Sequence, residues 1–252
     1  MRVSTGHRAV IGLQAWTFKH LGLVEVMAKA GKLGITKVQA FPGQELGGGL
    51  KGKFEPAMVE ESNRGKLRDL LRTNGSELVS LGVVNAEDEP GWRELFAFAK
   101  AFDVPDLTVE PPAGDVPLLD KLSREYGTPV SIHNHGGNLE ERLDQLKAFG
   151  PHMGLCIDTG HWVRHGREPV PSLRLAQGRL HSVHLKDMSA FAQDAHTVPF
   201  GEGVSDLRGQ LAELDRQGFN GIVFIEHEHH TPHLEADVEK CIEVLRRAGL
   251  TR

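Results

Sequence analysis

Two short apolar runs within residues 151–187 each end on residues that bind metals or transfer protons. Residues 154–157 are followed by Asp-Thr-Gly-His at 158–161, and residues 180–183 are followed by His-Leu-Lys-Asp at 184–187. Short, partly β-branched runs are typical of strands buried on both faces in a parallel sheet. Polar residues at the C-terminal ends of successive parallel strands are the usual arrangement of active sites in (β/α)8 barrels. The two motifs therefore predict neighbouring strand ends that carry a functional site.

Three further strand-like runs end on polar residues in the same way. Glu110 follows one run, His133 and His135 follow the next, and Glu226 and Glu228 follow the last. Side chains two residues apart on a strand share a face, so each of these pairs can point in one direction. Strand ends converge at the C-terminal face of a barrel. One cluster is therefore expected, made of Glu110, His133, Asp158, His184 and Glu226.

The composition of this cluster indicates a divalent metal site. Carboxylate and imidazole ligands with few thiolates suit Mn, Mg, Co, Fe or Zn, of which we favour Mn. A mixed oxygen and nitrogen set leaves room for two substrate oxygens on the ion. A single strand-end Glu or His is more often a salt-bridge partner or a structural residue. Recurrence at five consecutive strand ends indicates a functional site.

The elements that must position these residues form eight strand-then-helix units without linkers, repeats or low-complexity segments. A chain of 252 residues has the usual length of such a barrel. The sequence thus predicts an α/β fold, a single (β/α)8 TIM-barrel domain over residues 1–252. An open doubly wound sheet fits less well, because such a sheet concentrates its site at one switch point. The strands are expected at 10–13, 35–40, 78–84, 106–109, 128–132, 154–157, 180–183 and 222–225, and the helices at 23–34, 60–74, 92–102, 116–126, 139–149, 207–217 and 234–248. The segment between the strands at 154–157 and 180–183 is long enough for a further helical crossover.

One connection stands out within this pattern. Residues 41–52 are long and rich in glycine for a strand-to-helix connection. We expect them to form a mobile loop that lies over the site.

Bulk composition excludes several other classes of protein. The formal net charge of −5 does not favour a nucleic-acid phosphate backbone. No apolar run is long enough for a membrane span. Cys156 and Cys241 lie in apolar runs, so we interpret them as reduced core thiols and expect a cytoplasmic location. A homo-oligomer is compatible with the pattern but not required by it.

The Asp158-Thr-Gly-His161 and His184-Leu-Lys-Asp187 motifs, the Gly201-Glu-Gly203 loop and the strand-end Glu226 together resemble the sugar phosphate isomerase/epimerase family, which has the xylose isomerase-like barrel. The resemblance covers nearly the whole chain. It implies a divalent metal held by a Glu, an Asp, a His and a Glu from separate strands, of which Asp158, His184 and Glu226 match directly.

The fourth expected ligand departs from that pattern. Many members have a Glu at the end of the fifth strand, where this chain has His133, and its own glutamate ends the fourth strand as Glu110. The inosose dehydratase branch is similar, with His-x-His after its fifth strand. We favour Glu110 as the fourth ligand and His133 as a proton-transfer group or extra ligand. The departure weakens any transfer of the two-glutamate mechanism of the ketose 3-epimerases.

The expected chemistry is proton abstraction next to the carbonyl of a sugar or keto-sugar, with a metal-stabilised enediolate. Glu110, Glu226 and His133 are candidate bases, and Lys186 can stabilise an oxyanion. The remaining candidates contact substrate; they are His135, His161, Trp16, Gln39, Trp162 and Glu228. Isomerisation or epimerisation is the broader expectation. Dehydration or 3-keto-glycoside cleavage by a keto-sugar or keto-inositol lyase is the alternative.

Two other functions use the same barrel. The AP endonuclease branch shares the Asp158 and His161 motif, and Asp194-Ala-His196 is similar to its Asp-x-His element. It also needs histidines near the second and third strands, which this sequence lacks there. A sugar-binding barrel without catalysis is the other alternative, and it predicts binding without exchange of substrate protons.

Overall fold

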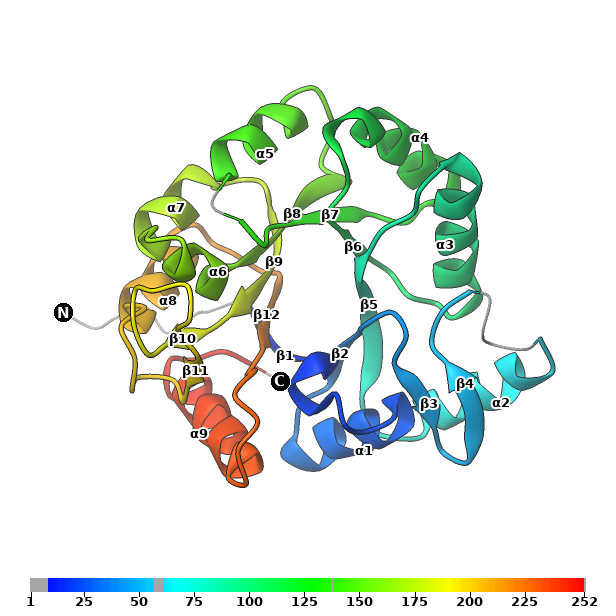
Figure 1. The fold of residues 1–252 in the computed structure, drawn as a ribbon, viewed down its shortest axis with the longest axis horizontal. Coiled ribbons are helices and arrows are strands. Elements are labelled where there is room, and N and C mark those ends of the chain that lie inside the picture. Colours follow the sequence, from blue (N-terminus) through cyan, green and yellow to red (C-terminus); the bar gives the residue numbers. More distant parts are fainter. Residues whose placement is uncertain (1–8, 57–60, 137, 252) are drawn as a thin grey trace.

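A closed parallel barrel forms the centre of the molecule. The computed structural model describes residues 9–56, 61–136 and 138–251. Eight parallel strands close in the order β1–β12–β9–β8–β7–β6–β5–β2, with helices around the outside (Figure 1). The predicted (β/α)8 TIM barrel is confirmed. The barrel strands are β1 (Val10–Gln14), β2 (Lys37–Ala40), β5 (Glu77–Val84), β6 (Leu107–Val109), β7 (Val130–His133), β8 (Met153–Asp158), β9 (Leu180–Leu185) and β12 (Ile222–Ile225).

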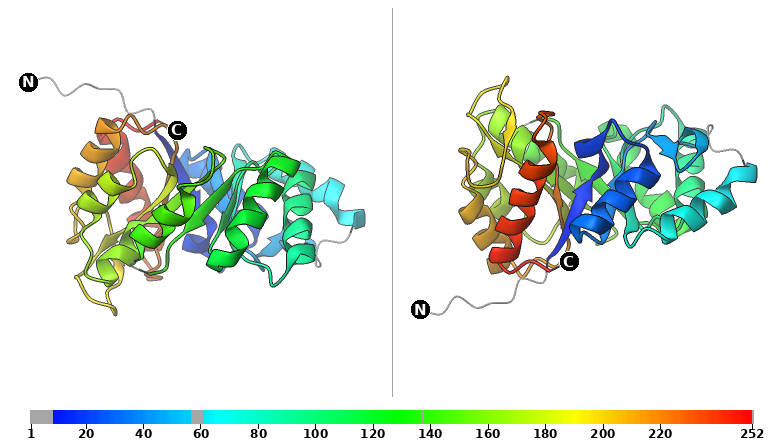
Figure 2. Two further views of the ribbon diagram at one scale, coloured as in Figure 1. Left: turned by 90° about the horizontal axis from the view of Figure 1, so that it is seen from above. Right: turned by 90° about the horizontal axis from the view of Figure 1, so that it is seen from below.

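The helices pack their apolar faces on the barrel and run alongside its strands in the two side views of Figure 2. Periodic apolar residues form these faces, as Val26, Met27 and Ala30 do in α1. The helices are α1 (Leu23–Leu33), α2 (Glu61–Arg72), α3 (Glu89–Ala101), α4 (Val116–Tyr126), α5 (Leu139–Leu146), α6 (Thr159–Arg164), α7 (Pro169–Leu175), α8 (Leu207–Arg216) and α9 (Leu234–Arg247), with short 3-10 turns η1 (Ala15–Phe18) and η2 (Ala113–Asp115). Residue 60, where the second helix was expected to begin, lies outside the described residues.

Three strands extend further than expected and carry predicted site residues inside the sheet. β7 includes His133, β8 includes Asp158 and β9 includes His184. The β8–β9 register pairs Asp158 with His184, and the β7–β8 register pairs His133 with Cys156. The backbone ladder, rather than a loop, therefore fixes these side chains relative to one another.

The glycine-rich segment 41–52 contains a hairpin, contrary to the loop we expected. β3 (Glu45–Gly47) pairs antiparallel with β4 (Leu50–Lys53). The connecting Gly48 and Gly49 have positive φ angles, and the Gly48 N–H donates to a carboxylate oxygen of Glu25 in α1. A second small hairpin, β10 (Asp187–Met188) with β11 (Thr197–Val198), projects at one end of the barrel (Figures 1 and 2). No helix in the described residues is long and apolar enough to cross a membrane.

Candidate functional site

Asp158, His184 and Glu226 converge at the C-terminal face of the barrel. One potential ligand atom of each lies within 4.8 Å of the others, and all three side chains are buried. His184 Nδ1 is 2.9 Å from Glu226 Oε2 and 3.9 Å from Asp158 Oδ2. The second oxygen of Asp158 is already engaged, because Oδ1 accepts the His161 N–H at the start of α6.

This group meets the chemical requirements of a divalent cation. His184 Nδ1, Asp158 Oδ2 and Glu226 Oε2 are buried, and no well-directed hydrogen bond reaches any of them. The Lys186 ammonium neutralises the two carboxylate oxygens from one side, and a divalent ion would give all three atoms a shared partner. Two carboxylates and one imidazole are ligands that Mn, Fe, Co and Zn accept.

A buried lysine lies behind the same carboxylates. Lys186 Nζ is 2.8 Å from Asp158 Oδ2 and 3.0 Å from Glu226 Oε2. It is also 3.1 Å from Glu228 Oε1, and Glu228 pairs in turn with Arg164 at 3.0 Å. Lys186 is not among the residues that line the cavity above the group. The lysine is therefore placed to balance the buried charge of these carboxylates, and its role at an oxyanion stays a prediction.

Charge and burial compete at these groups. Burial alone would raise the pKa of Asp158, but the Lys186 ammonium and nearby imidazoles outweigh it and hold the pKa well below its usual range. Burial is likewise outweighed at Glu226, where Lys186 and His184 lower the pKa to about 2. The three carboxylates around Lys186 overcome its burial and raise its pKa. Both carboxyl groups are thus ionised, as metal ligands must be.

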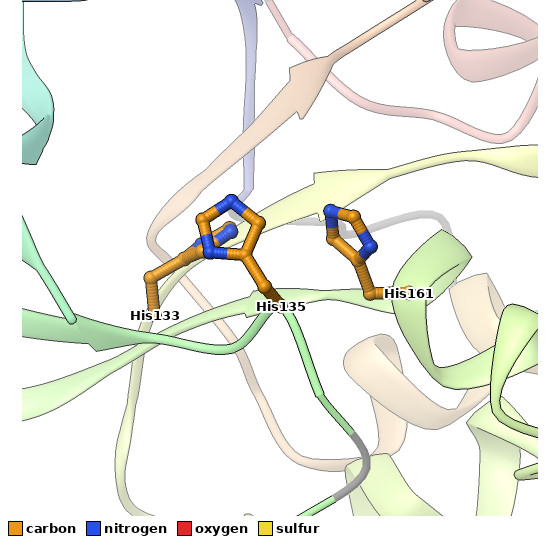
Figure 3. A group of neighbouring side chains, drawn as sticks. All are labelled: His133, His135 and His161. Carbon is orange, nitrogen blue, oxygen red and sulfur yellow. The ribbon is translucent and has the colours of Figure 1, made fainter.

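Three imidazoles form a second group above the first, drawn in Figure 3. One ring nitrogen of each of His133, His135 and His161 lies within 4.8 Å of the others. The rings of His135 and His161 have centroids 4.9 Å apart, and those of His133 and His184 are 5.0 Å apart. His133 thus belongs to the upper group and also adjoins the ligand set below.

The imidazoles differ in their surroundings. Burial and the neighbouring His184 hold the pKa of His133 well below its usual value, and burial also lowers the pKa of His161. The hydrogen bond to Glu110 raises the pKa of His135, which is half-exposed. Burial opposes protonation of His184, but the Cys156 sulfur and the Glu226 carboxylate outweigh burial and raise the pKa of its ring.

Glu110 does not join the ligand set, contrary to the expectation we favoured. Its Oε1 accepts the His135 backbone N–H at 3.0 Å, and its Oε2 contacts Nδ1 of the same histidine. Arg142 Nη2 lies 3.7 Å from Oε1. In the described part of the chain, no group of potential metal ligands includes Glu110. β6 ends at Val109, so Glu110 leaves the ladder and turns toward the β7 end.

A cavity of about 310 Å³ opens above both groups. The expected substrate contacts His135, His161, Trp16 and Glu228 line it. Trp16 is 37% exposed and packs edge-on against Phe41 with centroids 4.9 Å apart, so the two rings form an apolar wall. The full lining comprises Gln14, Trp16, Phe41, Pro42, Gly82, Val83, His133, His135, Asp158, His161, His184, Glu226 and Glu228.

Two expected substrate contacts lie elsewhere. Trp162 is fully buried in the hydrophobic core, because α6 turns its indole onto the barrel. Gln39 is fully buried beneath the site and accepts a hydrogen bond from His184. Asp194 and His196, the endonuclease-like pair, are exposed near β11 and are absent from the cavity lining and from the potential ligand groups of the described residues.

Small residues in the motifs have identifiable structural roles. A Cβ on Gly160 would lie 2.7 Å from both Cβ and Cδ of Lys186, so only glycine lets the lysine stem pass this closely. Asp187 accepts backbone N–H groups from Gly201, Gly203 and Ser205 at 2.8 to 3.1 Å. Asp187 therefore fixes the 201–205 loop beside β9. Within the described residues, the ion pairs of Lys186 are with Asp158, Glu226 and Glu228 and not with Asp187.

Sequence reasoning did not assign Gln14 and Arg164 to the site. Gln14 ends β1 and lines the cavity, so the rule that selected the other strand ends could have found it. Arg164 ends α6, one turn beyond the Asp-Thr-Gly-His motif, and nothing in its spacing indicates that it pairs with Glu228.

Comparison with known proteins identifies the family. A family model described as a xylose isomerase-like TIM barrel matches residues 117–248, which is more than half of the chain. The chain therefore belongs to the xylose isomerase-like TIM-barrel family. The barrel and the carboxylate and imidazole group at its C-terminal face agree with that membership.

Four particular proteins are similar to this chain. An inosose dehydratase of Lacticaseibacillus casei is 26% identical over 187 residues, which cover 65% of this chain and 61% of that protein. The match covers 44% of the Clostridium beijerinckii inosose dehydratase, so this chain spans only about half the length of the two curated relatives. A crystal structure of an uncharacterised protein from Parabacteroides distasonis has 30% identity and a TM-score of 0.78, covering 95% of this chain and 99% of that one. The IolI protein with a bound zinc atom shares the fold, with 16% identity, a TM-score of 0.74 and coverage of 95% and 98%.

Proposed function

We propose that this chain is a divalent-metal-dependent dehydratase that acts on a keto-inositol or keto-sugar. In the reaction, a carbon next to the carbonyl loses its proton and the neighbouring carbon loses its hydroxyl as water. The proposal rests on one observation: Glu110 lies outside the ligand group and binds His135 instead. Glu226 is then the one glutamate of the ligand group, and the imidazoles of His133, His135 and His161 line the cavity beside it.

This arrangement favours elimination over epimerisation. Inversion at one carbon by two bases needs a proton-transfer group on each face of the substrate, which two glutamates would provide. Elimination needs a base for the carbon-bound proton and an acid for the departing hydroxyl. The adjacent His135 and His161 rings, 4.9 Å apart on one side of the cavity, suit that pair of tasks.

The metal would be held by Asp158, His184 and Glu226, with His133 as the fourth donor in place of Glu110. A bound divalent ion would polarise the substrate carbonyl and so acidify the neighbouring C–H group. The Lys186 ammonium keeps the two carboxylates ionised and in place.

Substrate orientation follows from the remaining lining residues. The edge-packed Trp16 and Phe41 rings offer an apolar surface for one face of a sugar or inositol ring. Glu228, whose carboxylate is held by Arg164 and Lys186, can accept a hydrogen bond from a ring hydroxyl. The inosose dehydratases among the relatives support a cyclic polyol ketone as the first substrate class to try.

The test is incubation of the metal-supplemented protein with inososes and 3-keto-hexoses in heavy water, followed by NMR. Dehydration removes one water per turnover and gives a hydroxy-substituted unsaturated ketone, the enol form of a 1,2-diketone, which absorbs in the ultraviolet. Deuterium incorporation without loss of water would instead favour the isomerase or epimerase. Binding of the substrate without loss of water or deuterium incorporation would favour a sugar-binding barrel without catalysis.

A further inference from the structure

Two buried glutamines lie directly beneath the proposed metal ligands. Gln14 ends β1 and Gln39 lies in β2, and the strand register pairs them with each other. Gln39 Oε1 accepts hydrogen bonds from His184 Nε2 at 2.5 Å and from Gln14 Nε2 at 3.0 Å. Gln39 is therefore the direct neighbour of His184 on the side away from the carboxylates.

Backbone groups fix the orientation of the Gln14 amide. Gln14 Oε1 accepts the Trp16 N–H at 2.8 Å, and its Nε2 donates to the Gly82 carbonyl at 3.1 Å. A backbone N–H cannot accept and a backbone carbonyl cannot donate, so the amide cannot be reversed. The amino group of Gln14 therefore faces Gln39 and requires an acceptor there.

The orientation of Gln39 follows from that of Gln14. Its oxygen must face the Gln14 amino group, so its own amino group faces the opposite way. There Gln39 Nε2 donates to Ser80 Oγ at 2.9 Å and to Thr108 Oγ1 at 2.8 Å. All donor and acceptor positions of the Gln39 amide are thus satisfied by partners inside the barrel.

The chain of hydrogen bonds ends on a carboxylate that accepts. Ser80 Oγ donates to Asp106 Oδ2 at 2.7 Å, and Thr108 Oγ1 donates to the same oxygen at 3.2 Å. Asp106 Oδ1 accepts from Ser131 Oγ at 2.5 Å. Each hydrogen bond on the path from His184 through Gln39 to Asp106 therefore donates toward Asp106. Hydrogen bonds aligned in this way strengthen one another.

We infer that Gln39 is a positioning residue that fixes the ring of His184 for metal binding. Because the Gln39 oxygen can only accept, His184 Nε2 must carry the hydrogen between them. The lone pair of the neutral ring is then on Nδ1, which faces Glu226 Oε2 at 2.9 Å. Gln14 and the Ser80–Thr108–Asp106 group hold the Gln39 amide in the orientation that enforces this tautomer. The inference rests on the proposed metal site.

The test compares Gln39→Met and Gln39→Glu with the unmodified chain. Methionine keeps the length and loses the acceptor, whereas glutamate keeps the acceptor. The control is Gln44→Met, because Gln44 is also buried and its amide makes no hydrogen bond with the described residues. Zinc affinity is measured by calorimetry, and the coordinating nitrogen of His184 is assigned by long-range ¹H–¹⁵N correlation in the zinc-loaded protein.

In the unmodified chain, zinc is expected on Nδ1 of His184 with a slowly exchanging hydrogen on Nε2. Gln39→Met should weaken zinc binding about 10- to 100-fold and allow coordination through Nε2. Gln39→Glu and Gln44→Met should retain affinity within about threefold and keep the Nδ1 assignment. If Gln39→Met fails to fold, the glutamate variant still decides, since loss of affinity there contradicts an acceptor role.

Coordination through Nε2 in the unmodified chain, or unchanged zinc binding in Gln39→Met, would overturn the inference. If the unmodified chain binds no zinc, cobalt or manganese, the proposed metal site itself fails. In that case the neutral tautomer of His184 is assigned in the metal-free protein at a pH above the ring pKa. An Nε2–H tautomer that is lost in Gln39→Met would still support the role of Gln39, and an Nδ1–H tautomer would refute it.

Discussion

Both carboxylate oxygens of Glu110 are directed to His135, one to its backbone N–H and the other to its ring. The glutamate follows β6 and the histidine follows β7, so the contact crosses from one barrel strand to the next. A carboxylate can only accept, and it therefore holds the hydrogen of His135 on Nδ1 and leaves Nε2 for the cavity. The pair resembles the carboxylate–imidazole pairs that orient proton-transfer histidines.

The first prediction concerns this pair. Glu110→Gln should lower kcat/KM about 10-fold or more and leave metal content unchanged, because the amide orients His135 without stabilising its positive charge. Activity and elemental analysis are measured together on the same preparation. Glu202→Gln is the matched control, since Glu202 is an exposed carboxylate paired only with Lys240 among the described residues. Loss of metal in Glu110→Gln would instead show that Glu110 is a metal ligand.

His133 is predicted to be the fourth metal donor. Its Nδ1 lies 3.1 Å from the Cys156 carbonyl, which leaves Nε2 for the ligand group. His133→Ala should therefore weaken metal binding about 10- to 100-fold, whereas His161→Ala should lower activity and retain the metal. Calorimetry with manganese and zinc distinguishes the two variants. Equal metal affinity in both would refute the assignment.

Gly160→Ala tests whether close packing positions Lys186. The added methyl would contact the lysine stem and also approach Met188 Sδ, at 2.9 Å. Overpacking of a buried site should lower the free energy of unfolding by about 1 to 3 kcal/mol, as urea denaturation would measure. Gly114→Ala is the control, because a Cβ there meets no atom within 4 Å. Equal stability of the two variants would contradict this role of Gly160.

Glu213 is predicted to make folding stability depend on acid pH, far from the site. Hydrogen bonds from Arg216 and Gln217, opposed only in part by burial, lower the pKa of Glu213 to about 2. The folded-state pKa is below the ordinary 4.5, so this stabilisation is complete above about pH 4.5 and is lost as the pH falls toward 2.

Glu213→Gln should accordingly cost about 1 to 2 kcal/mol at pH 7 and little near pH 2. Urea unfolding over this pH range measures the difference. Glu239→Gln is the control, because Glu239 is exposed on α9. A constant difference between Glu213→Gln and the unmodified chain at every pH would exclude the assigned cause.

The strand ends could be predicted from the sequence because each buried strand is a short apolar run and the site residues directly follow such runs. Buried apolar runs identified all eight strands, and the polar residue after each run identified Asp158, His184 and Glu226. The partner of Glu110 could not be predicted in this way. β6 ends at Val109 as expected, but whether the glutamate after it turns inward or toward the next strand depends on backbone geometry beyond the end of the ladder.

Residues on helices and beneath the site were harder to place. Trp162 has the residue type of a substrate contact, but α6 begins at Thr159 and rotates the indole into the core. Gln39 was expected at the substrate, yet the pleat of β2 directs it into the barrel beneath His184. Both outcomes depend on backbone geometry that a single sequence specifies only indirectly.

The positions of the tryptophan side chains make intrinsic fluorescence a reporter of ligand binding in the cavity. Of the three tryptophans in the chain, Trp92 and Trp162 are fully buried, whereas Trp16 is 37% exposed at the cavity and lies 4.7 Å from Lys19 Nζ. Any molecule that settles against the Trp16–Phe41 wall must displace water from that indole alone. A shift or quenching of intrinsic fluorescence on titration would thus report occupancy without a label, and Trp16→Phe would silence the signal while keeping an aromatic wall.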